Sequence, residues 1–157
     1  MQNDPSKPRR KPIRLPADAY RKPGTWYFLT LCCKSKAPLF AQPEKRDLVR
    51  QILLETAKTN HVELTVYTIL PNHVHVICSA GEKGVPGFVR AFKSRSAVEL
   101  KHRFEVDSPW QFRYFDHKIR SEESLDAKCR YVRLNPVRLG LVARAEDYPW
   151  TGVLRSD

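Results

Sequence analysis

The sequence has no long apolar run. Its apolar stretches extend over only a few residues, too few for a helix that crosses a bilayer, and the opening MQNDPSKPRRKPIRLP lacks the apolar centre of a signal peptide. Internal repeats are absent, as are low-complexity blocks beyond the basic opening segment. These absences argue against a membrane partner, and we expect a cytoplasmic protein.

Cysteine patterns for metal binding or cross-linking are also missing. The four cysteines contain no Cys-x-x-Cys pair, and their neighbours are mostly apolar. Because structural zinc sites need closely spaced ligands and disulfide frameworks belong to oxidising compartments, we expect Cys32, Cys33, Cys78 and Cys129 to be buried and reduced. No histidine is followed two residues later by Thr or Ser, which excludes the metal-free phosphoesterases that use two such motifs.

Acidic residues are scarce relative to basic ones. The 157-residue chain has 17 Asp and Glu against 28 Lys and Arg, a formal net charge of +11. Lys and Arg gain affinity for nucleic acids by releasing phosphate counterions, so the charge favours a nucleic-acid partner. A ribosome-like or simply soluble basic protein has the same composition.

The length fits a single domain.

A basic extended arm is predicted over residues 1–22. Four prolines alternate there with Lys and Arg, a composition that resists helix and strand alike. The arm is either solvated or laid along a polyanion. If it binds DNA, the residues expected to do so are Arg9, Arg10, Lys11 and Arg14. Residues 23–157 then form one folded domain.

Hydrophobic periodicity predicts seven elements after the arm. They are a strand over 25–33, a helix over 44–59, strands over 62–70 and from His73, a helix over about 86–102, a strand over 111–119, and a helix that follows the N-cap Ser121 and ends before Asn135-Pro136. The two middle strands are expected to form a hairpin at Pro71-Asn72. The order β-α-β-β-α-β-α fits an α+β fold, an antiparallel sheet with helices packed on it, of ferredoxin or RNA-recognition-motif character.

The stretch PNHVHVIC places two of the five histidines one residue apart. Successive strand side chains face opposite ways, so His73 and His75 are expected on one face while Val74 and Val76 anchor the other in the core. Neutral ring nitrogens arranged this way can chelate one divalent ion, although two exposed histidines on a strand have the same spacing. A complete metal site also needs a third ligand from elsewhere.

The last predicted helix contains YVRLNPVRLG. Tyr131 and Asn135 are four residues apart, so they are expected on the same helical face, one turn apart. A half-buried tyrosine and a helix-terminal asparagine before proline explain the spacing equally well. Arg130 and Arg133 flank the tyrosine, and they either favour its phenolate and hold a phosphate or are solvated helix charges.

Further candidates lie on two other elements. Arg90, Lys93 and Arg95 are expected on the cationic outer face of the helix over 86–102, suited to DNA, where scattered aromatic side chains stack bases. In YFDHKIR, Asp116 and His117 should point to opposite faces of a strand. For these two, a structural hydrogen bond is favoured over a catalytic or metal-adjacent role.

Four motifs in this order, PNHVHVI, WQFRYFDHKIR, YVRLNPVRLGLV and DYPW, closely resemble the single-tyrosine HUH transposases, and specifically the REP-associated tyrosine transposases. The resemblance extends from about Arg10 to Trp150. It implies an HUH endonuclease fold, with residues 23–157 as the catalytic domain. It also implies Mg²⁺ or Mn²⁺ held by His73 and His75, Tyr131 as the nucleophile, and Asn135 in the place of a further polar ligand.

The resemblance further implies cleavage and rejoining of single-stranded DNA at REP-like hairpins through a 5′-phosphotyrosine, and association with the nucleoid. The alternative is a non-catalytic protein of the same fold that binds hairpin DNA or RNA. Some relatives exchange the tyrosine helix in a dimer. Here NPVRLGLV follows the helix directly, which favours a monomer.

Overall fold

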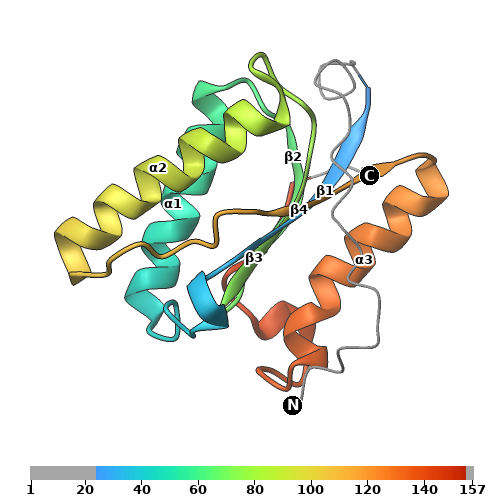
Figure 1. Ribbon diagram of the computed structural model, residues 1–157. Coiled ribbons are helices and arrows are strands. Elements are labelled where there is room, and N and C mark those ends of the chain that lie inside the picture. Colours follow the sequence, from blue (N-terminus) through green and yellow to red (C-terminus); the bar gives the residue numbers. More distant parts are fainter. Residues whose placement is uncertain (1–23, 155–157) are drawn as a thin grey trace, which may run out of the picture.

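The computed structural model describes residues 24–154, in which a five-stranded antiparallel sheet carries helices on both faces (Figure 1). The strand order is β4-β1-β3-β2-β5. The strands are β1 (Trp26–Cys32), β2 (Leu64–Ile69), β3 (His73–Cys78), β4 (Phe115–Ile119) and β5 (Thr151–Val153), and the helices are α1 (Pro43–Thr59), α2 (Gly84–Phe104) and α3 (Glu122–Arg138). The predicted α+β class, element order and β2–β3 hairpin are confirmed. The predicted arm, residues 1–22, lies outside the described residues.

The two faces of the sheet are covered unequally. Figure 1 shows α1 and α2 together on one face and α3 alone on the other. The larger core lies under α1 and α2 and includes Tyr27, Leu29, Val74 and Val76. A smaller core lies under α3, and its buried members are Phe28, Val66, Ile77, Ile119, Leu125 and Val132. The valines of β3 therefore anchor the strand as predicted, and its opposite face is left for a site.

Two boundaries differ notably from the prediction. β4 begins at Phe115 rather than 111, because the preceding segment packs on α2, where Lys93 donates hydrogen bonds to the Gln111 and Phe112 carbonyl oxygens. α3 continues through Pro136 to Arg138. Pro136 lacks only its own backbone N–H, and its fixed φ is compatible with the last helical turn. In that turn the Leu139 N–H still donates to the Asn135 carbonyl oxygen.

The edge strand β5 was not predicted. It is three residues long and contains Gly152, which pairs with Tyr67 on β2. A Cβ at this position would overlap the Tyr67 ring, so only glycine lets the two strands approach. A Thr-Gly-Val segment gives no periodic signal, and the strand forms because it adds to an existing edge.

None of the helices between residues 24 and 154 is both long and apolar enough to span a bilayer.

The segment before β5 closes on the end of β2, and this contact generates a stability prediction. The buried Tyr148 hydroxyl donates to the Ile69 carbonyl oxygen at 2.6 Å. Tyr148→Phe leaves that buried acceptor without its partner, so the free energy of unfolding should fall by about 1–2 kcal/mol. Urea unfolding followed by circular dichroism measures the change. Tyr131→Phe is the matched control, because Tyr131 is 36% exposed; an equal loss in both variants would contradict the assignment.

Candidate active site

His73 and His75 lie on the face of β3 that α3 covers. Strand register places Thr30 of β1 opposite His75 on one side and Thr68 of β2 opposite it on the other. His75 is only 5% exposed, so the pair is not a doublet of solvated surface histidines. The two-residue spacing on one strand brings the rings within 4.6 Å between centroids, at an interplanar angle of 83°. The prediction of a shared face is therefore confirmed.

Both imidazoles are fixed by hydrogen bonds at their Nδ1 atoms. His73 Nδ1 lies 2.6 Å from Asn72 Oδ1, and His75 Nδ1 lies 3.0 Å from Thr30 Oγ1. The two Nε2 atoms then face each other at 3.1 Å. Because Asn72 Oδ1 only accepts, His73 carries its proton on Nδ1 and its Nε2 lone pair is free to accept. When Thr30 Oγ1 also accepts, both Nε2 lone pairs point to the same place.

Burial keeps the histidine pair neutral. It lowers the pKa of His73, and it lowers the pKa of His75 to about 3, with the adjacent His73 adding to the effect. At neutral pH both rings are therefore uncharged. A neutral imidazole retains the lone pair that a metal ion requires.

The pair has the geometry of two ligands to one small divalent ion. Two donors that each lie about 2.1 Å from an ion and subtend about 90° are about 3.0 Å apart, close to the observed 3.1 Å between the Nε2 atoms. The Nδ1 hydrogen bonds are the outer contacts that ligating histidines make. Among the described residues no group of three His, Cys, Asp or Glu side chains is placed to hold a metal.

Tyr131 packs directly over this pair. Its ring centroid lies 5.9 Å from that of His75 and 6.0 Å from that of Phe28. Phe28 in turn stacks on His75 at 5.3 Å. Val132, its neighbour on α3, is buried in the core beneath the helix, so the helix is fixed while Tyr131 stays 36% exposed. The structure thus brings together the histidines and the tyrosine that the sequence singled out.

Two cations that the sequence interpretation passed over lie against the Tyr131 ring. The Arg138 guanidinium carbon is 4.5 Å from the ring centroid, and Lys128 Nζ is 5.8 Å from it. They stand seven residues after and three residues before Tyr131, spacings that return to one helical face. Arg130 and Arg133, the predicted pair, are exposed neighbours on α3. The hydrogen bond from Arg144 is the main cause that lowers the pKa of the Glu146 carboxyl, and the charge of Arg133 adds a smaller contribution.

Asn135 is 6% exposed and lies one turn after Tyr131 on α3. Pro136 does not break the helix at this point, so Asn135 remains on the helix that covers the histidines. A buried amide on the covering helix is compatible with the role of a third ligand.

Asp116 and His117 point to opposite faces, as expected. In the sheet register Asp116 lies opposite Leu29, on the face of the larger core, and is buried. His117 lies opposite Phe28, on the face that carries the histidine pair, and is exposed. Asp116 is therefore separated from Tyr131 by the sheet.

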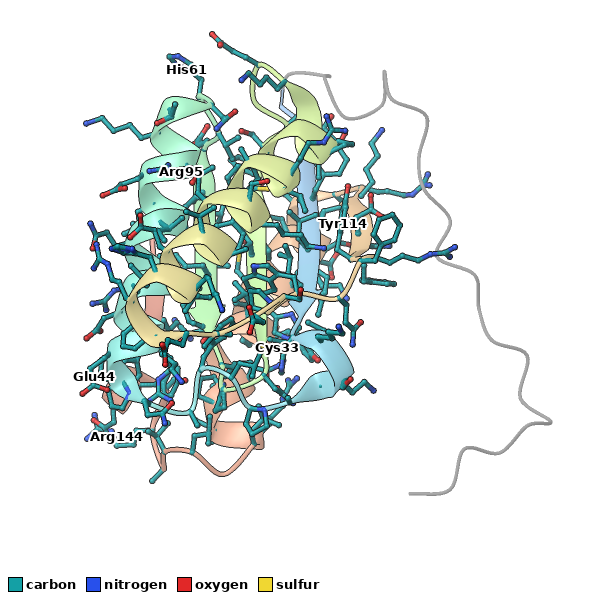
Figure 2. The ribbon with its side chains drawn as sticks, turned by 60° about the vertical axis from the view of Figure 1, so that its left-hand side comes forward. Cys33, Glu44, His61, Arg95, Tyr114 and Arg144 are labelled. Atoms are coloured by element: carbon teal, nitrogen blue, oxygen red, sulfur yellow. The ribbon has the colours of Figure 1, made fainter. Side chains whose placement is uncertain are left out.

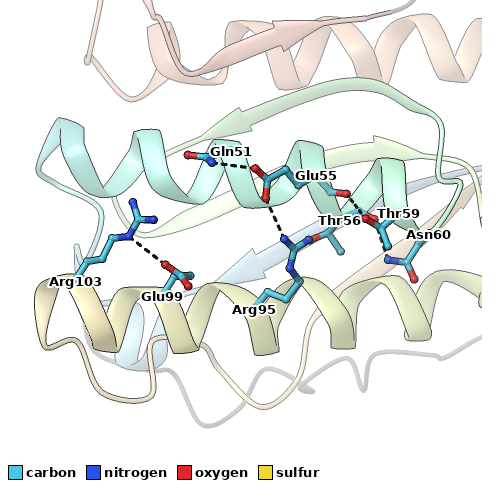
Figure 3. Close-up of polar contacts among 8 residues, drawn as sticks. All are labelled: Gln51, Glu55, Thr56, Thr59, Asn60, Arg95, Glu99 and Arg103. Carbon is cyan, nitrogen blue, oxygen red and sulfur yellow. Dashed lines mark hydrogen bonds and ion pairs between the residues drawn. The ribbon is translucent and has the colours of Figure 1, made fainter.

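The predicted cationic face of α2 lies across the sheet from Tyr131 (Figure 1). Arg95 is committed to structure there: it donates to Glu55 at 3.0 Å and to Thr56 at 2.9 Å on α1 (Figure 3). Lys93 holds the Gln111 carbonyl oxygen at 2.8 Å, and Arg90 is exposed. Arg9, Arg10, Lys11 and Arg14 lie outside the described residues.

Several site residues were not identified from the sequence. Thr30 and Phe28 come from β1, more than forty positions before His75, and only the strand register brings them to it. Asn72 adjoins the histidine motif but was read only as a turn residue. Lys128 and Arg138 share the helical face of Tyr131, and helical spacing was sufficient to find them.

The comparisons with known proteins agree with this geometry. Residues 22–135 match the family model described as "Transposase IS200 like". A REP-associated tyrosine transposase of Escherichia coli K12 is 24% identical over 132 residues, covering 84% of this chain and 78% of the relative. The ISDra2 transposase TnpA of Deinococcus radiodurans is 33% identical over 75 residues, covering 47% of this chain and 53% of that protein.

A solved structure has the same fold. It is described as a REP-associated tyrosine transposase bound to a REP hairpin, and it matches with a TM-score of 0.69 at 21% identity, over 93% of this chain and 81% of the other.

The depressed histidine pKa values generate a prediction for the metal-free protein. An unfolded histidine titrates near pH 6.5, whereas folded His75 stays neutral until about pH 3. Between these values the unfolded state binds more protons, so the free energy of unfolding should fall as pH drops from 6.5 to 5, by up to about 1.4 kcal/mol per pH unit for one such residue.

Urea unfolding in EDTA at several pH values measures this slope. His75→Gln should flatten it, while His61→Gln should not, because the His61 side chain is 68% exposed. Equal slopes in the wild type and His75→Gln would refute the assignment.

Proposed function

The chain belongs to the IS200-like transposases, and from that membership we propose that it cleaves and rejoins single-stranded DNA with Tyr131 as the covalent nucleophile. The observation that supports this most directly is the packing of Tyr131 across His75, at 5.9 Å between ring centroids, within one chain. A nucleophile and a pair of metal-competent imidazoles thus lie at one place on the sheet. Their positions come from separate elements, β3 and α3, which makes an accidental juxtaposition a poor explanation.

The proposed cofactor is Mg²⁺ or Mn²⁺, with His73 and His75 as ligands and Asn135 as the third. When bound, a divalent ion supplies Lewis acidity that polarises a phosphate oxygen. Asn72 and Thr30 lie within hydrogen-bond distance of the two Nδ1 atoms and orient both rings with Nε2 toward the proposed ion. Phe28 stacks on His75 and keeps water from one side of the ring.

Tyr131 performs the covalent step. Its phenolic oxygen forms a bond to phosphorus as the bond from phosphorus to the 3′ oxygen breaks. The phenol proton passes to solvent and the departing 3′ oxygen takes up a proton, so the products are a 5′-phosphotyrosine and a 3′-hydroxyl. Arg138 and Lys128 lie against the ring, where their charges favour the developing phenolate and the phosphate. Reversal of the step rejoins the strand.

The proposed substrate is a REP-like hairpin with a single-stranded flank. The net charge of +11 supplies the electrostatic attraction. Phosphate contacts are assigned to Arg130 and Arg133 beside Tyr131, to Arg90 and Lys93 on α2, and to Arg9, Arg10, Lys11 and Arg14 in the proposed arm, residues 1–22, which precedes the proposed domain of residues 23–157. Arg95 is left out of this set because it pairs with Glu55. Association with the nucleoid follows from the same partner.

A monomer is the proposed active form. Tyr131 contacts His75 of its own chain, so no helix from a second copy is needed to complete the site.

The first test is formation of a covalent adduct. Wild-type protein mixed with Mn²⁺ and an end-labelled hairpin with single-stranded flanks, taken from DNA beside the gene, should give a species that survives denaturing electrophoresis. Tyr131→Phe removes the nucleophilic oxygen and should reduce the adduct at least about 10³-fold.

Tyr67→Phe is the matched control, because Tyr67 is buried in the larger core on the opposite face of the sheet, and its adduct should equal that of the wild type. Tight binding by the wild type without any adduct would overturn the proposal in favour of a non-catalytic hairpin-binding protein.

The second test concerns Thr30 as the residue that positions His75. Thr30→Val removes the Oγ1 atom that lies 3.0 Å from His75 Nδ1, and loss of such an outer contact lowers metal affinity by about 10- to 100-fold. Titration calorimetry with Mn²⁺ alone measures the dissociation constant. Thr30→Ser keeps the oxygen and should restore affinity.

Thr68→Val is the control for this measurement. Thr68 also lies opposite His75, but its Oγ1 bonds to Thr151 at 2.7 Å. Equal losses of Mn²⁺ affinity at Thr30 and Thr68 would show that the effect is general damage to the sheet.

A further inference from the structure

A second concave surface lies between α2 and the segment 108–114. This groove has a volume of about 480 Å³. Its walls include Val89, Arg90 and Lys93 from α2, and Trp110, Phe112 and Tyr114 from the segment. Figure 2 shows Arg95 on the side of α2 toward α1 and Tyr114 on the other side of the helix. The groove is therefore distinct from the surface where Arg95 pairs with Glu55.

The segment that forms one wall is held firmly on the N-terminal side of Phe112. Trp110 Nε1 donates to Ser96 Oγ at 2.8 Å, and the Trp110 ring packs against Phe40 and Phe92. The Gln111 amide donates to the Cys32 carbonyl oxygen at 2.9 Å, and Lys93 reaches the Gln111 carbonyl oxygen at 2.8 Å. These contacts fix the backbone that carries Phe112.

Phe112 nevertheless points into solvent. It is 93% exposed, the most exposed of the large apolar side chains between residues 24 and 154. Exposing a phenyl ring to water gives up the free energy that its burial would release. A rigid segment that holds an uncovered aromatic ring at the mouth of a groove has the form of a stacking platform.

The charge of the groove indicates which class of ligand binds there. Arg90 and Lys93 line it, and no Asp or Glu does. The neighbouring groove between α1 and α2 has the opposite character, because Glu55 and Glu99 line it and pair with Arg95 and Arg103. Aromatic side chains combined with basic ones, in a groove that no acidic side chain lines, match single-stranded nucleic acid, whose bases stack while its phosphates meet the cations.

The segment that carries Phe112 leads directly into β4, the edge strand that borders the active-site face. Phe115, the first residue of β4, is 50% exposed and lies opposite Thr30, which contacts His75. Phe112 precedes Phe115 by three residues, roughly 10 Å of extended chain. Arg113 between them is exposed as well. A strand of DNA that leaves the histidine pair over this edge meets Phe115 and then the groove.

We propose that the groove between α2 and the segment 108–114 binds unpaired bases of the DNA substrate, with Phe112 stacking on a base and Arg90 contacting a phosphate. The inference rests on the proposed function, which supplies single-stranded DNA as the substrate, and it adds a binding site on the opposite side of the sheet edge from Tyr131. Binding there needs neither the histidine pair nor the nucleophile, so EDTA does not abolish it.

The test measures DNA binding by the full chain in EDTA, by fluorescence anisotropy. The probes are a dye-labelled oligothymidylate of about 12 nucleotides, within the span of known single-strand sites, and a blunt duplex of the same length. Phe112→Ala should weaken oligothymidylate binding about tenfold, equivalent to about 1.4 kcal/mol, and leave duplex binding within about twofold of the wild type. Phe112→Trp should retain the affinity. Arg90→Ala should lower the salt dependence by about one ion.

Val98→Ala is the matched control. Val98 is a 65% exposed apolar residue of α2 that lines the other groove, and its truncation should change neither affinity. Unchanged oligothymidylate binding by Phe112→Ala would overturn the proposal, as would equal loss on both probes. Sedimentation showing a dimer that Phe112→Ala dissociates, with DNA affinity unchanged, would assign the groove to a second copy instead.

The two proposals fail separately. If the Tyr131 adduct forms but Phe112→Ala does not change DNA binding, only the proposal for the groove is refuted. If Phe112→Ala weakens binding but no adduct forms, only the proposal of covalent cleavage is refuted.

Discussion

The approach of two imidazole Nε2 atoms to 3.1 Å is the constraint that the rest of the site depends on. It requires His73 and His75 on one face of one strand, a hydrogen-bond partner at each Nδ1, and enough burial to keep both rings neutral. β3 meets these requirements because it is a central strand whose opposite face is anchored in the larger core. The partners on β1 and in the β2–β3 turn then determine which ring nitrogen is available.

The unequal covering of the sheet gives the site its access. Two helices, α1 and α2, cover one face, whereas α3 alone lies on the other. On that second face Phe115 and His117 of the edge strand are exposed. Tyr131 stands at the boundary between the covered and uncovered parts of that face, 36% exposed and against His75. A nucleophile placed there is held by packing and still reaches a polymer substrate, which a buried tyrosine does not.

The sequence predicted local features well and the links between distant ones poorly. Strand alternation located both histidines on one face, helical spacing placed Tyr131 and Asn135 together, and Ser121 was correctly assigned as the N-cap. What it missed depends on tertiary structure: Thr30 reaches His75 only through strand register, β5 forms only because β2 offers an edge, and α3 passes Pro136 because its final turn loses one backbone donor. Lys128 and Arg138, the cations against the Tyr131 ring, were missed because sequence neighbours were preferred to residues one or two helical turns away.

The account therefore centres on whether the facing Nε2 atoms hold a single ion beneath Tyr131. Anomalous diffraction from crystals of the protein soaked with Mn²⁺ tests this most directly. The account predicts one strong peak within about 2.3 Å of both His73 Nε2 and His75 Nε2, with Asn135 and the Tyr131 ring beside it. A peak bound to only one histidine, or Mn²⁺ located elsewhere with the pair unoccupied, would contradict it.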